Sequence, residues 1–412
     1  MCLPNCHKLR DLSPLSGLVS LHKLVLANCR RLSEIGQSVS ALVGLQTLDL
    51  SGFPLHFNPD EPQEKNRLLI DVGPLSSLVG LHAVTLSGFN RLRDLGSLSA
   101  LVGLHSLSVD GCRALTDLRP LSALVGLQSL DLWNCDQLTD VSPLSALVGL
   151  HALVLNGCRA LTDLRPLSML VGLPSLNLGR CGQLTDVSPL SALVGLHSLS
   201  FNGCERLADL RPLSALVGLQ SLVLSACDHL CNSAQLSALV GLHALTSLDL
   251  SGFWELTDLR PLSSLVGLQS LALRSCQQLT DLRPLSALVS LQSLDLGWCG
   301  HCGQLSDVSP LSALVGLQSL DLSSCEQLTD LRPLSALVGL QSLDLGRCGQ
   351  LSDLRPLSAL GLQRLGLFGC RALRDVTPLS ALVSLRTLDI RHCSGLSDVS
   401  PLSALIGLHL DM

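Results

Sequence analysis

The chain has 412 residues, of which 47% are hydrophobic, 15% charged and only 2% aromatic, and its formal net charge is −6. An acidic chain without a basic face is not expected to bind nucleic acid. Its mean hydropathy of +0.45 is high, yet polar residues interrupt every apolar run before the roughly 18–20 residues that a membrane-spanning helix needs. We therefore expect neither nucleic-acid binding nor a membrane span.

The first residues, MCLPNCHKLRDL, contain no apolar segment of the signal-peptide type. The chain has 17 cysteines and no Asn-x-Ser/Thr glycosylation site. Many cysteines without an export signal favour a reducing compartment, in which the thiols stay free. We therefore expect a cytoplasmic or otherwise intracellular location. An extracellular location stays open if the chain belongs to a longer protein.

A unit of 23 residues with the consensus LxxLxLxxCxxLTDLRPLSALVG recurs from end to end. With Leu127 as position 1, we count seventeen units from Met1, followed by the truncated piece LHLDM. One such unit cannot bury its leucines alone, so stacking is required. This predicts a single solenoid over residues 1–412. The main exceptions are an insertion loop over residues 54–68 and a shorter insertion at 300–302.

Each unit is expected to contain one strand and one helical turn. Positions 4 and 6 are aliphatic and alternate with polar residues, which is typical of a half-buried strand. The later SPLSALVG segment predicts a single turn, α or 3-10, because it is too short for a free-standing helix. In the unit that begins at Leu127, we expect Ser142 as the N-cap, Pro143 as the first helical residue and Gly149 as the C-terminal stop.

The half-unit LxxLxLxxCxxL resembles the leucine-rich repeat superfamily in its cysteine-containing type. The other half, TDLRPLSALVG, is similar to the variable half of internalin-type repeats. The resemblance covers nearly the whole chain. It implies an α/β solenoid, a leucine-rich-repeat horseshoe with a parallel concave β-sheet and short helical or 3-10 turns on the convex side.

Position 9 is cysteine in fourteen units and phenylalanine in three. Exchange between these residues indicates a buried apolar slot, where a free thiol behaves as a small hydrophobe. Zinc sites use closely spaced pairs with a second pair nearby, whereas Cys299 and Cys302, the one pair separated by two residues, lack a second pair nearby. We therefore predict a column of buried thiols, with no metal and no other cofactor. Neighbouring cysteines about 5 Å apart would also be within disulfide range under oxidising conditions.

Position 14 is aspartate in fifteen units, and arginine follows two residues later in seven of them. Carboxylates stacked about 5 Å apart repel unless they accept hydrogen bonds, so we predict backbone N–H donors from the following turn. The arginines are expected to add neutralisation. A calcium ladder would need more oxygen ligands at each site than one aspartate supplies.

The resemblance implies that strand positions 3, 5, 7 and 8 face out of the concave side. Positions 7 and 8 vary most, and large residues there are the best contact candidates, because Trp and Arg are common interface anchors. The predicted partner-binding residues are Trp133, Arg180, Arg274, Trp298, Arg347, Phe368 and Arg391, with Trp254 at position 10 on the same rim. Exposed single aromatics are common on surfaces, and drift among duplicated repeats gives the same pattern, so both interpretations stay open.

No catalytic constellation stands out, since every Ser, Asp and Cys has copies in equivalent positions and catalysis needs a unique arrangement. The leading hypothesis is a non-enzymatic protein–protein interaction scaffold with a protein partner of unknown identity. One alternative is the substrate-receptor part of a ubiquitin-ligase complex, although no F-box is present. The other is an internalin-like surface adhesion protein.

The chain opens and closes inside a strand and shows no polar terminal cap. Three interpretations stay open: part of a longer protein, which we favour, end-to-end self-association through the exposed strand edges, or a gene model under weak selection.

Overall fold

A computed structural model describes residues 1–29, 39–52, 72–230, 233–299 and 305–412. The two predicted insertions, at 54–68 and 300–302, lie outside these residues, as does Cys302. The chain divides into two compact units, Met1–Leu207 and Ala208–Met412.

Every strand in the described residues is three residues long, and all except β17, which lies in the truncated last piece, occupy positions 3 to 5 of their repeat. The unit Met1–Leu207 contains β1 (Lys23–Val25), β2 (Thr47–Asp49), β3 (Ala83–Thr85), β4 (Ser106–Ser108), β5 (Ser129–Asp131), β6 (Ala152–Val154), β7 (Ser175–Asn177) and β8 (Ser198–Ser200). The unit Ala208–Met412 contains β9 (Ser221–Val223), β10 (Ser247–Asp249), β11 (Ser270–Ala272), β12 (Ser293–Asp295), β13 (Ser319–Asp321), β14 (Ser342–Asp344), β15 (Arg364–Gly366), β16 (Thr387–Asp389) and β17 (His409–Asp411).

The helical turns that lie wholly within the described residues are of the 3-10 type, whereas residues 39 and 40 are α-helical. The first unit contains η1 (Ser13–Leu15), η2 (Gly73–Ser77), η3 (Gly96–Ala100), η4 (Arg119–Ala123), η5 (Ser142–Ala146), η6 (Arg165–Met169) and η7 (Ser188–Ala192). The second contains η8 (Arg211–Ala215), η9 (Asp228–Leu230), η10 (Ser233–Leu239), η11 (Arg260–Ser264), η12 (Arg283–Ala287), η13 (Ser309–Ala313), η14 (Arg332–Ala336), η15 (Arg355–Leu357), η16 (Thr377–Ala381) and η17 (Ser400–Ala404).

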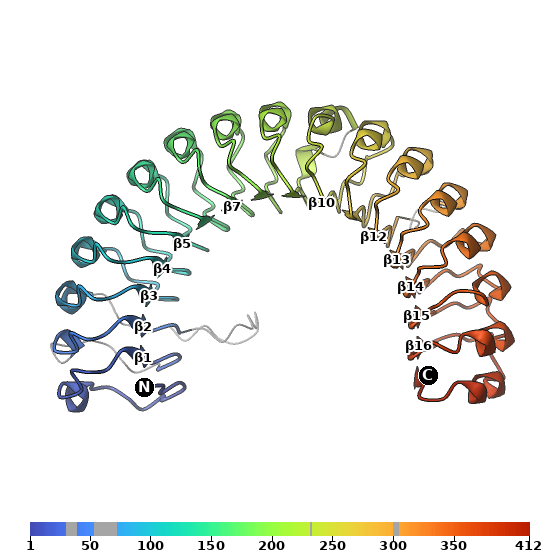
Figure 1. The fold of residues 1–412 in the computed structure, drawn as a ribbon, viewed down its shortest axis with the longest axis horizontal. Coiled ribbons are helices and arrows are strands. Elements are labelled where there is room, and N and C mark those ends of the chain that lie inside the picture. The colour runs from blue at the N-terminus through green and yellow to red at the C-terminus, as the bar shows by residue number, and fades with distance from the viewer. Residues whose placement is uncertain (30–38, 53–71, 231–232, 300–304) are drawn as a thin grey trace. The chain divides into compact units, whose positions relative to one another are not determined.

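Strands of successive repeats pair in parallel, with equivalent positions opposite each other. Leu107 pairs with Leu130 and Leu130 with Leu153 in the first unit, and Leu320 pairs with Leu343 in the second. The middle residue of each of these strands is buried and its neighbours are half exposed or exposed. In each unit the strands line one side and the 3-10 turns the opposite side (Figure 1). The predicted repeat solenoid, with a parallel sheet and 3-10 turns, is confirmed.

The core consists of aliphatic columns that continue from repeat to repeat. In the repeat that begins at Leu127, the residues Leu130, Leu132, Leu138 and Leu144 are all fully buried. Full burial of one leucine side chain stabilises a fold by about 1.5–3 kcal/mol. Because each repeat covers the apolar residues of its neighbours, three-residue strands and single turns suffice for a stable fold.

The predicted capping residues need correction. Ser142 is the first residue of η5 rather than its N-cap, and Pro143 is the second. The cap comes from Asp140, whose Oδ1 accepts the Ser142 N–H at 2.8 Å. Gly149 lies beyond the C-cap residue Leu147 and outside the left-handed region. A Cβ there would lie 3.5 Å from the Val125 carbonyl oxygen, an ordinary van der Waals distance, so neither the backbone conformation nor the packing requires glycine at this position.

The longest 3-10 turn among the described residues, η10, has seven residues. None of the helical segments in that part of the chain has the length and apolar character needed to cross a membrane.

Candidate partner-binding surface

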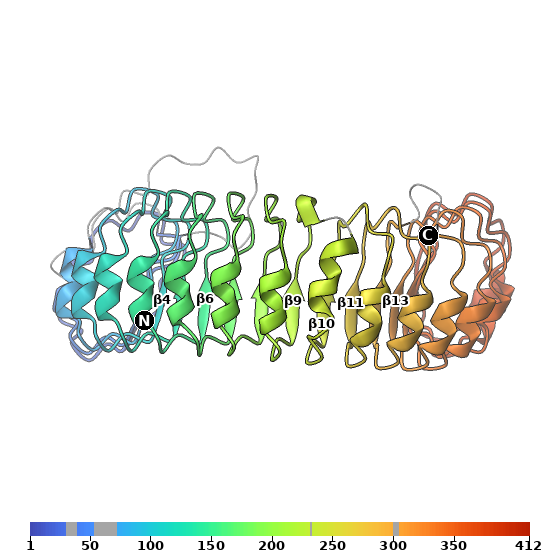
Figure 2. The same cartoon turned by 90° about the horizontal axis from the view of Figure 1, so that it is seen from above.

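The loops before and after the strands form two opposite rims of each unit (Figure 2). We call positions 7 and 8, which follow each strand, the C-terminal rim. A position-5 side chain shapes this rim in many repeats, because its oxygen accepts the N–H of position 7. Examples are Asp295 Oδ1 with the Gly297 N–H at 2.8 Å and Asp389 Oδ1 with the Arg391 N–H at 3.0 Å. Part of the acidic character of position 5 is therefore structural.

Position 8 adopts a left-handed backbone conformation throughout the described repeats that have this turn. Six of these residues are glycines and ten are not. The non-glycine residues with positive φ are Asn5, Asn28, Asn134, Arg180, Ala226, Ser275, Trp298, Ser324, Arg347 and His392. A side chain other than Gly, Asn or Asp there costs roughly 1–2 kcal/mol. Gly and Asn recur at position 8, and these residues favour a left-handed backbone. This signal in the sequence could have predicted the turn, but our sequence analysis did not use it.

Four of the predicted contact residues come together on the C-terminal rim of the second unit. The Arg347 guanidinium carbon lies 5.1 Å from the ring centroid of Trp298 and 5.5 Å from that of Phe368. The Arg391 guanidinium carbon lies 5.7 Å from the Phe368 centroid. His392 packs edge-on against Phe368 with centroids 5.0 Å apart. We call these five residues the aromatic–arginine cluster; cation–π contacts hold it together.

Arg347 reaches Trp298 across an intervening repeat, whose position 8 is Ser324. Ser324 is only 2% exposed, and its hydroxyl has no hydrogen-bond partner among the described residues. A small residue at this point lets the guanidinium reach the indole ring. Two features of this region lower the stability of the fold. One is the left-handed backbone at non-glycine residues of the cluster, and the other is the unsatisfied buried hydroxyl of Ser324 beside it.

Carboxylates border the cluster on the exposed face of the sheet. Asp295, Asp321 and Asp344 lie opposite one another on β12, β13 and β14. Burial, reinforced by the Asp321 charge, raises the pKa of Asp295 and of Asp344. Arg274 offsets part of this charge, because its Nη1 lies 3.7 Å from Asp295 and 3.9 Å from Asp321. At the other end, a hydrogen bond from Arg391 lowers the pKa of Asp389.

The remaining predicted contact residues lie outside the cluster. Trp133 is 40% exposed on the first unit, and its Nε1 donates to Asn156 Oδ1 at 3.1 Å. Arg180, also on the first unit, is exposed and left-handed. Trp254 is 46% exposed on the second unit, and its carbonyl accepts the Gln278 N–H at 3.2 Å. These three residues are accessible, and none of the contacts described above joins one of them to another.

The cysteines of position 9 form a ladder of buried thiols, as predicted. Most of these thiols donate to a carbonyl oxygen of the preceding repeat; the Cys158 Sγ, for example, donates to the Leu132 oxygen, 26 residues earlier, at 3.4 Å. Burial raises the pKa of Cys158 and of Cys112 to about 12. Thiols held in this protonated state are poor nucleophiles and poor metal ligands. Within the described part of the chain, no three His, Cys, Asp or Glu side chains gather in a way that could hold a metal ion.

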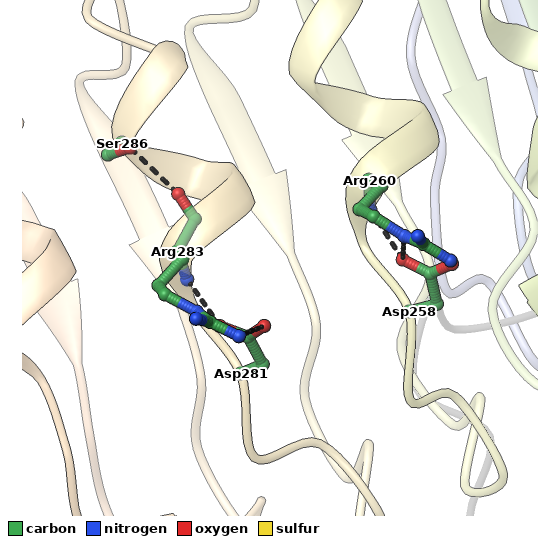
Figure 3. Close-up of polar contacts among 5 residues, drawn as sticks. All are labelled: Asp258, Arg260, Asp281, Arg283 and Ser286. Carbon is green, nitrogen blue, oxygen red and sulfur yellow. Dashed lines mark hydrogen bonds and ion pairs between the residues drawn. The ribbon is translucent and has the colours of Figure 1, made fainter.

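The aspartates of position 14 cap the 3-10 turns, and Figure 3 shows two of them, Asp258 and Asp281. Asp281 Oδ1 accepts the Arg283 backbone N–H at 2.9 Å, and its Oδ2 accepts from the guanidinium Nη2 at 2.8 Å. Asp258 and Arg260 repeat this geometry. The side-chain and backbone hydrogen bonds from Arg283 lower the pKa of Asp281 to about 2. The predicted backbone capping and arginine neutralisation are therefore confirmed.

A shallow hollow of about 300 Å³ lies between these two Asp–Arg pairs, bordered by Thr257, Leu259 and Pro284. Both guanidinium groups already bind their own carboxylates (Figure 3). The hollow is thus a by-product of the capping arrangement, and we do not assign a ligand to it.

A family model described as "Leucine Rich repeats (2 copies)" matches residues 315–359. The buried cysteine ladder, the parallel three-residue strands and the 3-10 turns extend the same repeat along the described chain. The chain is a leucine-rich repeat protein. No curated protein sequence matches it.

Solved structures of leucine-rich repeat proteins have the same fold. A leucine-rich repeat protein from Leptospira interrogans is 19% identical, with a TM-score of 0.71, and the match covers 98% of this chain and 99% of that one. The functional domain of InlJ from Listeria monocytogenes, described as including a cysteine ladder, is 19% identical with a TM-score of 0.54, over 94% of this chain and 71% of that one. An internalin, InlF, from the same species is 22% identical with a TM-score of 0.47, over 99% and 97%.

Proposed function

We propose that this leucine-rich repeat protein is a non-enzymatic scaffold that binds a protein partner through its strand-lined face. The observation that supports this most is the aromatic–arginine cluster. It gathers three rings and two guanidinium groups from four of five successive repeats on one rim. Trp and Arg dominate the energetics of many protein interfaces, and clustered anchors contribute more than scattered ones.

The cluster is also preorganised. Cation–π contacts restrain Arg347 and Arg391 before a partner arrives, which reduces the side-chain entropy lost on binding. The left-handed backbone at Trp298 and Arg347 fixes where these side chains leave the chain. Asp321 and Asp344 lie on adjacent strands beside the cluster. This arrangement suits a partner segment that presents an apolar side chain next to a basic one.

Trp133, Arg180, Arg274 and Trp254 remain proposed contact residues of secondary weight. Their exposure supports the proposal, while their separation limits what each adds to binding.

The proposal is tested by affinity capture from the source cells under reducing conditions with three chains. These are the native protein, the cluster variant Trp298→Ser/Arg347→Ser/Phe368→Ser, and the control Arg260→Ser/Arg283→Ser/Arg332→Ser on the opposite side. We expect one partner held by the native chain and the control and lost by the cluster variant. With that partner purified, calorimetry should show binding weakened by about 30-fold or more, the scale of a hot-spot loss. Equal capture by all three folded chains would refute the proposed site.

We also propose a reducing, intracellular compartment. The support is that thirteen of the fifteen described cysteines are buried, where a thiol packs as a small apolar side chain. Fractionation of source cells with thiol alkylation would test this. Fully reduced protein inside the cell agrees with it. Protein on the outer surface would favour the adhesion alternative, and co-purification of ligase subunits would favour the substrate-receptor alternative.

A further inference from the structure

Two opposite charges in the repeat that begins at Leu340 have no ion-pair partner in the described part of the chain. Asp344, at position 5, uses its Oδ1 to accept the Gly346 N–H at 2.8 Å, while its Oδ2 accepts no hydrogen bond from the described residues. The guanidinium group of Arg347, at position 8, has ring contacts but no hydrogen bond or ion pair with those residues. Both Asp344 and Arg347 are exposed. Each charge is therefore accessible to a partner.

An arginine at position 7 of the same rim behaves differently. Arg391 donates from its Nε and Nη2 to the two carboxylate oxygens of Asp389, at 3.0 and 2.7 Å. Arg347 stands one position later in its repeat and has a left-handed φ of 61°. Its guanidinium lies over two rings of the aromatic–arginine cluster instead of beside the carboxylate of its own repeat. The backbone and the two rings thus keep its charge apart from Asp344.

The contacts of Arg347 favour a carboxylate ligand. A guanidinium group is planar and has five N–H donors in a fork that matches the two oxygens of a carboxylate. Contact with the rings of Trp298 and Phe368 restrains this fork and leaves its donors without acceptors among the described residues. A restrained donor group loses less conformational entropy when a ligand binds. A partner carboxylate would therefore gain charge-assisted, bidentate hydrogen bonds at small cost.

The surroundings of Asp344 favour a cation. Gly366 lies directly opposite Asp344 on β15, and a Cβ at Gly366 would lie only 2.6 Å from the Asp344 Oδ1. Because glycine has no side chain, the strand leaves this side of the carboxylate uncovered. Burial, reinforced by the Asp321 charge, raises the pKa of Asp344. A cation beside the carboxylate would therefore relieve an unfavourable charge.

We propose that the partner segment contains both an acidic and a basic residue, with its carboxylate bound by Arg347 and its cation bound by Asp344. This inference rests on the proposed function, because it names the chemistry of the segment that the aromatic–arginine cluster holds. A segment with charges of only one sign would satisfy one of the two groups and meet like charge at the other. An apolar side chain of the same segment contacts the rings of Trp298 and Phe368.

A peptide library displayed on phage tests this without the natural partner. Random peptides of about 12 residues are long enough to cross several strands at about 4.8 Å spacing. They are selected on the native chain, and those that also bind the cluster variant described above are removed. We expect the remaining peptides to contain an acidic, a basic and an apolar residue close together.

The tightest selected peptide is then synthesised, and its Kd is measured by fluorescence anisotropy against matched variants. Arg347→Gln should weaken binding about 10-fold or more, the scale of a lost charge-assisted hydrogen bond. Asp344→Asn should weaken it about 3-fold, because this carboxylate is exposed. The control Arg355→Gln removes an exposed arginine of the same repeat that is bound to Asp353, and it should leave the Kd unchanged.

Replacing the acidic residue of the peptide by its amide sharpens the test. The amide peptide should bind the native chain about 10-fold more weakly. The Arg347→Gln variant should hardly distinguish the two peptides, because the contact is already lost. Arg347→Lys, which keeps the charge but loses the fork, guards against misfolding and should give an intermediate Kd. Circular dichroism should show the same fold in all these chains.

The outcomes separate this inference from the proposed function. Peptides that need the cluster but contain no acidic residue would overturn the inference and leave the proposed binding face intact. An equal loss of affinity for the amide peptide in the native chain and in Arg347→Gln would also overturn it. Failure to obtain any peptide that distinguishes the native chain from the cluster variant would contradict both proposals.

Discussion

The two rims of each repeat have similar access to solvent but opposite sequence behaviour. The C-terminal rim of the second unit gathers Trp298, Arg347 and Phe368, each different from the equivalent residue of the neighbouring repeats. The N-terminal rim of the first unit repeats valine without exception from Val79 to Val194. Both rims are loops of the same scaffold, so packing of the core does not explain the contrast.

The contrast indicates two kinds of surface. A diversified rim suits recognition of one partner that has no internal repeat, because each anchor then contacts a different part of it. The uniform rim presents the same side chain, valine, in successive repeats. The scaffold thus has one varied and one regular surface, and substitutions can alter either surface without changing the other.

The largest expected effect on the free energy of unfolding comes from the columns of buried leucines that support both rims. Leu130→Ala removes a fully buried side chain of β5, and it should lower the free energy of unfolding by about 3 kcal/mol. Val125→Ala, on the N-terminal rim before the same strand, should change it by less than about 0.5 kcal/mol. Urea unfolding of both variants and of the native chain gives the comparison. Equal losses at both positions would mean that valines are core residues.

The next effect concerns the destabilising features of the C-terminal rim. Ser324→Gly removes an unsatisfied buried hydroxyl and relieves a left-handed residue with φ of 62°. We expect a gain of about 1 kcal/mol in unfolding free energy. Ser275→Gly, also left-handed but less buried, is the control and should gain less. No gain at Ser324 would show that its hydroxyl is satisfied by water.

A smaller effect is expected from the carboxylates beside the cluster. The pKa of Asp344 is raised by burial, so its charged form costs stability once the pH exceeds the ordinary Asp value of 3.8, and the cost disappears below it. Asp344→Asn keeps an oxygen for the Gly346 N–H. It should stabilise the protein by about 0.3 kcal/mol at pH 7, after allowance for solvent screening, and by nothing at pH 3. Thermal unfolding at both pH values measures this; a loss at pH 7 would contradict it.

The smallest effect on stability is expected at the 3-10 turns, on the side of each unit opposite the strands. Arg119→Gln removes the guanidinium that is the main cause of the lowered pKa of Asp117, about 2, while Asp117 Oδ1 still accepts the backbone N–H of residue 119. Stability from this lowered pKa is present above pH 3.8 and is lost as the pH falls towards 2. The variant should therefore be slightly less stable than the native chain at pH 7 and lose less stability between pH 4 and about 2, so that the two chains converge at low pH. A large drop at pH 7 would mean that the ion pair, rather than the backbone cap, holds η4.

Much of this architecture was predictable because it repeats. The period, the aliphatic columns and the thiol ladder follow from which positions tolerate only apolar residues. The aspartate cap followed from charge, since stacked carboxylates need donors. The assignment of Ser142 as a cap was wrong. Ser and Asp are both good caps, and the sequence does not show which of the two precedes the turn. In the structure, Asp140 accepts the first N–H of the turn and is the cap.

The sequence by itself determined the repeat, its strand, its turn and the residues that fill its core, because these depend on polarity and period within one unit. Only the tertiary structure decided which rim residues meet. The approach of Arg347 to Trp298 depends on side-chain reach across a repeat and on a small residue, Ser324, between them. It also depends on the left-handed conformation of position 8. Contacts between side chains of different repeats have no periodic signature, so stacking in three dimensions was needed to reveal them.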